Sequence, residues 1–167
     1  SFFRPDEDGN RQRSHFDGLA VDFVAEAINT LGLQSARTGL PGFETYHVMN
    51  PHDDGIGIDE YVDWLIDAGY SIERSGDFHD WLPRFEAALQ ALPEQQRKNS
   101  VLQMLVLLRR SGVLQEQPEP TRGGSGSTAR FRAEVQSAGI GSEGDIPHVA
   151  PSTVVKYAIE LQKFGLL

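Results

Sequence analysis

Residues 43–57, FETYHVMNPHDDGIG, decide how the rest of the chain is interpreted. Large apolar or aromatic residues alternate with polar ones over residues 43–49, which predicts a half-buried β-strand. Asn50 and Pro51 end this strand, because proline cannot donate a hydrogen bond to a sheet ladder. Ligands of open α/β sheets bind beyond the carboxyl ends of strands, so we expect a site near this strand end.

Helical patterns flank the predicted strand. The expected helices cover residues 22–31, 58–68, 78–92, 94–110, 128–137 and 151–164. We expect Asp22 to cap the first helix and Gly32 to end it, with a loop over residues 33–42. Pro83 predicts a kink or a broken first turn in the helix expected at residues 78–92. The apolar run 101–108, in the helix expected at residues 94–110, predicts that other parts of the protein cover this helix on more than one side.

A second short strand is expected at residues 70–74, and each of the two strands precedes a helix. That order indicates a parallel sheet, which is normally buried on both faces. Two strands alone do not form a stable sheet. The predicted fold class is therefore a helix-rich α/β domain, with one or two strands that belong to a parallel sheet completed by upstream sequence.

Composition limits the function classes. The chain has 167 residues, 39% of them hydrophobic and 23% charged, which is typical of one globular domain. A net charge of −9 argues against a nucleic-acid partner, which needs a basic surface. No apolar run approaches the roughly 20 residues of a membrane span. The absence of cysteine excludes disulfides and thiolate chemistry and favours a cytoplasmic location.

None of the candidate ligand-binding patterns in the sequence has the residue spacing that its ligand requires. His47, His52, Asp53 and Asp54 match no familiar metal site, so no metal is expected. A calcium loop aligned on Gly55 would place a tyrosine at the twelfth position, where a glutamate is needed. The glycine- and serine-rich residues 123–127 follow no strand, and we interpret residues 116–127 as a flexible linker.

No complete catalytic set is found in the sequence. The acidic residues of 53–60 fit a solvated turn and a helix N-terminus, where the helix dipole favours negative charge. A Tyr-x-x-x-Lys pair is absent, and the nearest spacing ends in Arg74, which does not release its proton. We therefore expect no catalytic residue in this chain.

Several segments together resemble the C-terminal part of the reductase domain of bacterial, in particular actinobacterial, carboxylic acid reductases. These are residues 1–3, 8–13, 17–28, 46–60, 62–65, 129–136, 145–148, 155–157 and 165–167. The combination of His-Val-Met-Asn-Pro, Asp-Ile-Pro-His and the final Gly-Leu-Leu is specific. Two places depart from the pattern: Ala20 stands where proline is expected, and residues 109–127 are unlike the usual shorter connection.

The resemblance implies an extended short-chain dehydrogenase that uses NADPH to reduce a phosphopantetheine-carried thioester to an aldehyde. The cofactor loop and the catalytic residues would lie upstream of this chain. The expected partners are that upstream nucleotide-binding half and the carrier domain, while ATP and Mg would belong to an adenylating domain. Residues 1–115 would hold late Rossmann elements and substrate-side helices, and 128–167 a helical segment that packs on the same subdomain.

His47, Met49 and Asn50 are the candidate substrate-binding residues, because they lie at the end of the predicted strand. Ordinary packing and turn capping would also explain them. Two other functions stay open at this point. The first is the C-terminal part of another extended short-chain dehydrogenase, such as a peptide-synthetase thioester reductase or a sugar epimerase. Alternatively, the apolar run 101–108 could belong to a non-catalytic helical interaction domain.

Overall fold

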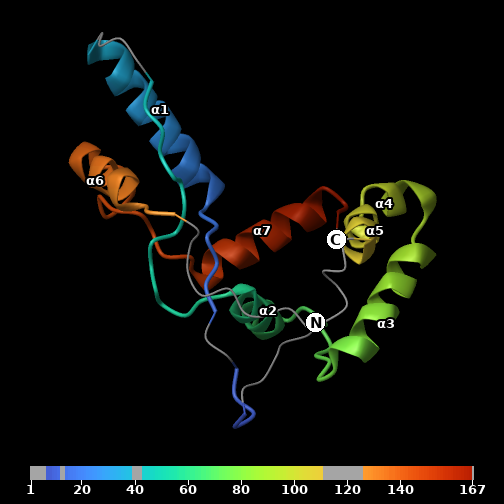
Figure 1. Cartoon of the computed structure of the whole chain (residues 1–167). Helices are drawn as coiled ribbons and strands as arrows, with labels where there is room; N and C mark the ends of the chain where they lie inside the picture. Colours follow the sequence, from blue (N-terminus) through green and yellow to red (C-terminus); the bar gives the residue numbers. More distant parts are fainter. Residues whose placement is uncertain (1–6, 12–13, 39–42, 111–125, 167) are drawn as a thin grey trace. The chain divides into compact units, whose positions relative to one another are not determined.

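The computed structural model describes residues 7–11, 14–38, 43–110 and 126–166. Two compact units form within the chain. The small unit comprises Ser1–Gln12 with Ser71–Pro120, and the large unit comprises Arg13–Tyr70 with Thr121–Leu167. Within the described ranges every regular secondary-structure element is a helix (Figure 1). Arg11 and Ser75 are isolated β-bridge residues.

The large unit is built from two helix pairs. Helix α1 (Val21–Thr38) packs against α6 (Ala129–Ala138), and α2 (Ile58–Asp67) packs against α7 (Pro151–Lys163) (Figure 1). The two pairs are joined where α1 begins, because the backbone N–H of Val21 donates to the hydroxyl of Tyr157 on α7 at 2.9 Å.

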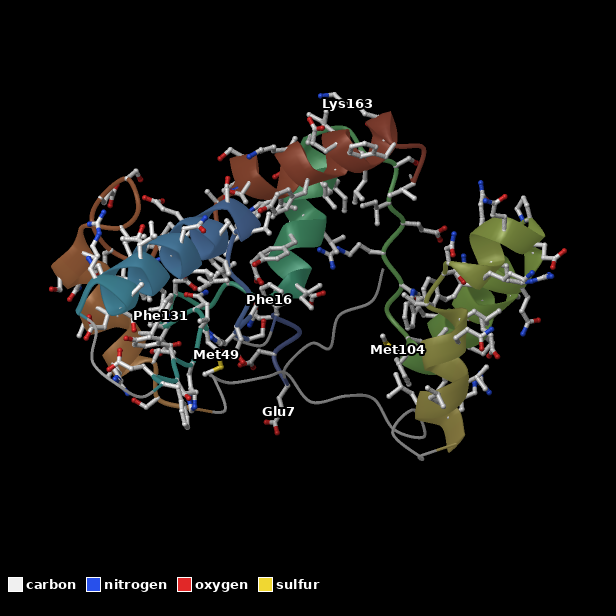
Figure 2. The ribbon with its side chains drawn as sticks, turned by 90° about the horizontal axis from the view of Figure 1, so that it is seen from above. Glu7, Phe16, Met49, Met104, Phe131 and Lys163 are labelled. Atoms are coloured by element: carbon white, nitrogen blue, oxygen red, sulfur yellow. The ribbon has the colours of Figure 1, made fainter. Side chains whose placement is uncertain are left out.

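The core of the large unit lies between α1 and α6. Its buried members are Phe23, Ala27, Phe131, Val135, Ile140 and Ile146. Phe131 is 2% exposed and meets Phe23 edge to face, with ring centroids 6.4 Å apart (Figure 2). The loop after α6 supplies Ile140 and Ile146, so that loop is part of the core and does not simply connect two helices.

The small unit packs three helices around a smaller core. These are α3 (Phe78–Ala91), α4 (Glu94–Lys98) and α5 (Leu102–Arg110). Asp77 caps α3, because its carboxylate accepts from the backbone N–H groups of His79 and Asp80. Phe78, Leu82 and Leu105 form the buried cluster.

Residues 43–53 contain no strand, so the predicted strand at 43–49 is not formed within this chain. A strand exists only when a neighbour accepts and donates its ladder hydrogen bonds. The short strand expected at 70–74 is likewise absent as a regular element. Both findings agree with a sheet whose other strands belong to sequence outside this chain.

Four helix expectations are corrected. Asp22 lies in the first turn of α1, not at its cap, and α1 continues past Gly32, since glycine inside an exposed helix costs only about 1 kcal/mol. Helix α3 runs through Pro83 without a broken first turn, and the alternative expectation of a kink stays a prediction. The helix expected at 94–110 is split, because Ser100 Oγ donates to the carbonyl of Arg97 and accepts from the N–H of Leu102.

The apolar residues of α5 are not covered on several sides as expected. Leu102 and Leu105 are buried, whereas Met104 and Leu107 are mostly exposed. Most of the predicted linker, residues 116–125, lies outside the described residues, so the boundaries at 115 and 127 remain predictions. No helix in the described part of the chain is long and apolar enough to cross a membrane.

Replacing Phe131 by alanine should lower the free energy of unfolding of the large unit by about 3–5 kcal/mol, the usual cost of emptying a core phenylalanine site. Phe164 is 76% exposed in the same unit, so Phe164→Ala is the matched control and should change stability by less than about 0.5 kcal/mol. Urea denaturation followed by circular dichroism measures both. Equal losses in the two variants would contradict the proposed core.

Candidate functional site

Asn50 is buried at the end of the predicted strand, where it is 4% exposed. Its side-chain Nδ2 donates to the carbonyl of Phe16 at 3.1 Å, and its Oδ1 accepts from the N–H of His52 at 3.0 Å. Its backbone N–H donates to the carbonyl of Asp17 at 2.9 Å. These bonds tie residues 16–17 to residues 50–52, so the turn-capping interpretation describes what Asn50 does in this structure.

His47 and Met49 lie beside Gly126. A Cβ placed on Gly126 would come within 2.5 Å of His47 Nδ1 and 3.4 Å of the Met49 methyl group. His47 is exposed, and Met49, which is labelled in Figure 2, is half-buried. The structure therefore brings two of the three predicted residues to one place and leaves their direct contact with a substrate as a prediction.

Two loops meet next to these residues, and we call residues 50–57 together with residues 145–148 the loop junction. His52 Nε2 donates to the carbonyl of Ile146 at 2.7 Å, and His148 Nδ1 donates to Asp54 Oδ2 at 2.9 Å. The two imidazole rings stack with centroids 3.6 Å apart and an angle of 20° between their planes. The Asn-Pro-His-Asp-Asp and Asp-Ile-Pro-His segments are therefore in direct contact.

Asp54 is the acidic residue at the centre of the junction. Burial by itself would raise the pKa of its carboxyl, but the hydrogen bonds from His148 and from the N–H of Ile56 lower the pKa below its usual value. Burial, reinforced by the negative charge of Asp54, raises the pKa of Tyr61 to about 12. The Tyr61 hydroxyl is buried and makes no hydrogen bond within the described structure. Tyr61 is thus neutral at ordinary pH.

Asp145 anchors the other loop. Its carboxylate accepts from Arg132 at both oxygens, with the closest contact at 2.6 Å, and also from the side chain of Gln136 and the N–H of Ile146. The hydrogen bonds from Arg132 hold the pKa of Asp145 well below its usual range. The Asp-Ile-Pro-His segment is thereby fixed to α6.

Gly57 and Glu60 fix where α2 begins. The Glu60 carboxylate accepts from the N–H of Gly57 at 2.7 Å. A Cβ on Gly57 would fall 1.8 Å from Ser14 Oγ, so only glycine allows this approach. The loop junction consequently leads directly into a helix with a fixed start.

A half-open cavity of about 270 Å³ lies along α1. Its walls come from α1, from residues 44–48 and from Phe131. Val21 and Ile28 on α1 are each about two-thirds exposed. At the cavity rim Glu44 accepts from the Tyr46 hydroxyl at 2.7 Å and from Arg130 at 2.6 Å. The hydrogen bond to Glu44 raises the pKa of Tyr46.

The described residues contain no group of three or more His, Asp or Glu side chains that could hold a metal ion. What the loop junction offers is hydrogen bonding and proton binding by imidazole and carboxylate. Sequence reasoning missed His148 as the partner of Asp54, because no local pattern joins residues 94 positions apart. The usable signal was that both segments carry the family resemblance.

No family model matches the chain. Over 171 residues it is 59% identical to "Isonitrile lipopeptide synthase" of Mycobacterium tuberculosis, and over 168 residues 54% identical to "Carboxylic acid reductase" of Mycobacterium marinum, with all of this chain covered in both. A crystal structure of the reductase (R) domain of a nonribosomal peptide synthetase from Mycobacterium tuberculosis matches the whole chain with a TM-score of 0.82 and 57% identity. Over its whole length the chain is thus similar to a part of this reductase (R) domain and of the carboxylic acid reductase.

The chain is only a part of such proteins. It spans 7% of the lipopeptide synthase and 13% of the carboxylic acid reductase, and 37% of the crystallised R domain. The described residues form helices and no sheet, and they match part of an R-domain structure, which agrees with the fold-class prediction.

Replacing Asp145 by asparagine should lower the free energy of unfolding at pH 7 by about 1–3 kcal/mol, since it removes the charge that the Arg132 guanidinium pairs with. The folded-state pKa of Asp145 is depressed, so its stabilising effect is present above the unfolded pKa of about 4 and is lost as pH falls through the lower folded pKa. The difference between wild type and variant should therefore shrink below about pH 4.

Denaturant titrations of the two proteins from pH 7 to pH 3 measure this difference. The control is Glu160→Gln, because Glu160 pairs with Lys163 on the exposed surface of α7, where ion pairs contribute about 0–1 kcal/mol. A gap between wild type and the Asp145 variant that widens on acidification would disprove the assignment.

Gly141 and Gly139 form a matched pair in the loop after α6. Both have positive φ angles, +83° and +64°, but a Cβ on Gly141 would also come within 2.8 Å of the Asp145 carbonyl oxygen, whereas a Cβ on Gly139 meets nothing. Gly139→Ala should cost about 1 kcal/mol for the left-handed backbone alone. Gly141→Ala should cost clearly more. Thermal denaturation distinguishes the two, and equal melting temperatures would count against this loop geometry.

Proposed function

We propose that this chain forms the substrate-side part of an NADPH-dependent reductase that converts a phosphopantetheine-carried acyl thioester to an aldehyde. The supporting observation is the match over the whole chain to both carboxylic acid reductases and a peptide-synthetase R domain. Reduction of a carrier-bound thioester is the chemistry that the two kinds of enzyme would share. The expected cytoplasmic location is part of the same proposal.

With NADPH bound by sequence outside this chain, a hydride would be transferred to the thioester carbonyl carbon. The carbon–sulfur bond would break, and the thiol of the carrier arm would leave with a proton. NADPH binding and catalysis belong to sequence outside this chain, as do the ATP and Mg of an adenylating domain. The residues of this chain serve to bind the acyl arm and to exclude water.

His47 and Met49 are the residues we propose to contact the arm, because they lie together beside Gly126. Asn50 has its side-chain amide committed to Phe16 and His52, so its proposed role is to hold the end of the segment. This gives the three predicted residues two different tasks.

A complete reductase domain that contains this chain tests the function. With an acyl-pantetheine thioester and NADPH it should form the aldehyde, with equal amounts of NADPH oxidised and aldehyde produced. The 167-residue chain alone should neither bind NADPH in the micromolar range by calorimetry nor reduce the thioester. Micromolar NADPH binding by the chain alone, or a complete domain that forms no aldehyde, would refute the proposal.

His47→Ala and Met49→Ala in the complete domain should each raise KM for the thioester about fivefold, the factor that corresponds to a lost contact of ~1 kcal/mol. They should leave kcat less affected, because the contact is made in both the bound and the transition state. Lys98→Ala is the control, since Lys98 pairs with Glu94 on the exposed surface of the small unit. Unchanged KM in both site variants would contradict the assignment.

A second candidate is reductive release of a peptidyl chain in a nonribosomal peptide synthetase. The sequence identities favour it, at 59% to the lipopeptide synthase against 54% to the M. marinum carboxylic acid reductase. Peptidyl and simple acyl thioesters on the same carrier, compared by kcat/KM with the complete domain, decide between the two.

A further inference from the structure

We infer that the half-open cavity along α1 is a docking groove, and that a β-strand from the part of the reductase domain outside this chain occupies it. The cavity, lined by one side of α1, by residues 44–48 and by Phe131, is called the α1 groove below. The inference rests on one element of the proposed function, that this chain is a part of a reductase domain. It does not rest on the reduction of a thioester.

Helix α1 carries more apolar surface than its contact with α6 covers. Phe23 and Ala27, four residues apart, are buried in the core. Ile28 is 65% exposed, and Val21, two helical turns before it and so on the same side of α1, is 67% exposed. A surface helix normally turns its apolar face toward a core. The second apolar side of α1 therefore indicates a surface that another part of the protein covers.

Gly32 also lines the α1 groove. It lies inside α1, where alanine would favour the helix more than glycine does. A Cβ on Gly32 would meet nothing within 4 Å among the described residues, so no contact within them requires a glycine. Glycine in such a place is typical of a point where another backbone approaches closely. Gly32 therefore fits a groove whose occupant comes from outside the described residues.

The α1 groove is separate from the residues proposed to contact the acyl arm. Every second residue from 44 to 48 lines the groove, whereas His47 and Met49 lie beside Gly126. This alternation is typical of an extended segment, whose side chains point to opposite sides in turn. The groove thus lies on the other side of residues 43–49 from the proposed arm contacts, and its occupant is not the arm.

The same segment indicates what kind of element fills the groove. Residues 43–49 have the sequence pattern of a β-strand, run alongside α1 and form no strand within the described residues (Figure 1). A neighbouring strand that completed this ladder would lie about 4.8 Å away, with its side chains next to those of Tyr46 and Val48 on the same face. Those side chains would lie over α1, as they do when a helix covers one face of a sheet.

The groove suits apolar side chains of such a strand. Val24, Ile28 and Leu31 form its apolar wall. The Glu44 carboxylate at its rim accepts from Arg130 at 2.6 Å and from the Tyr46 hydroxyl, so its charge does not require a partner on the occupant. The chain spans 37% of the matched R domain, and the remainder of such a domain is long enough to supply the strand.

Cysteine labelling tests the inference, because this chain contains no cysteine of its own. Ile28→Cys places a thiol in the groove. Leu33→Cys is the matched control, since Leu33 is 59% exposed on α1 and is not among the groove residues. In the dilute 167-residue chain both thiols should react with a maleimide at similar rates. In the complete reductase domain the Ile28→Cys thiol should react about tenfold more slowly or less, and the Leu33→Cys thiol as before.

Backbone hydrogen exchange and one further variant test the strand and its approach. The amides of residues 44–48 should exchange about tenfold more slowly in the complete domain than in the chain alone, because ladder hydrogen bonds protect them. Gly32→Ala should raise the melting temperature of the chain alone and lower that of the complete domain, where the added methyl group would meet the occupant. Asn29→Ala, at an exposed position of α1, is the control and should act in the same direction in both.

Equal protection of the two thiols in the complete domain would overturn the inference, as would a Gly32→Ala variant that raises both melting temperatures. Protection at position 28 that is lost on dilution of the complete domain would assign the groove to a second copy. Protection that appears only with an acyl-pantetheine thioester would assign it to the substrate, and either result would also overturn the inference. Labelling does not depend on activity, so a complete domain that protects position 28 but forms no aldehyde supports this inference and refutes the proposed chemistry.

Discussion

The buried side chain of Asn50 is the interaction on which the large unit depends. Residues 43–53 form no strand in this chain, so no backbone ladder holds them. One amide instead binds the carbonyl of Phe16 and the N–H of His52, and the backbone N–H of the same residue binds Asp17. Asn50 thereby joins the approach to α1 with the approach to α2, and it is the first residue of the loop junction.

The same principle operates at the second loop. The Asp145 carboxylate accepts hydrogen bonds from Arg132, Gln136 and the N–H of Ile146. The carbonyl of Ile146 accepts one from His52. Polar side chains here perform the task that a sheet performs elsewhere, which is to satisfy backbone groups that would otherwise be buried without partners.

The helices could be predicted from the sequence where a face was clearly apolar and a stop signal was unambiguous. Helix α2 was predicted to within a residue or two because of the spacing of Ile58, Tyr61, Val62 and Leu65 and because Gly69 follows. Helix α1 was underestimated, since Gly32 looked like a stop but lies on an exposed surface where its cost is small. The break at Ser100 depended on a local side-chain hydrogen bond that periodicity does not register.

The candidate site was predictable only in part. A ligand site was expected at the end of the 43–49 segment, and that expectation stays a prediction. The structure places hydrogen-bonded polar side chains there. That His148 would meet Asp54 could not be predicted, since no spacing rule connects the two loops. The burial of Asn50 also could not be predicted from the sequence, because an asparagine before a proline is usually part of an exposed turn.

The exposed apolar residues of α1 have a consequence for handling the protein at the bench. Ile28 lines a half-open apolar cavity and is mostly exposed, as is Val21 on the same helix. The matched R domain is far longer than this chain. Contiguous apolar surface of this kind drives self-association when nothing covers it. Sulfate strengthens the association of apolar surfaces, so its addition should lower the solubility of this polypeptide.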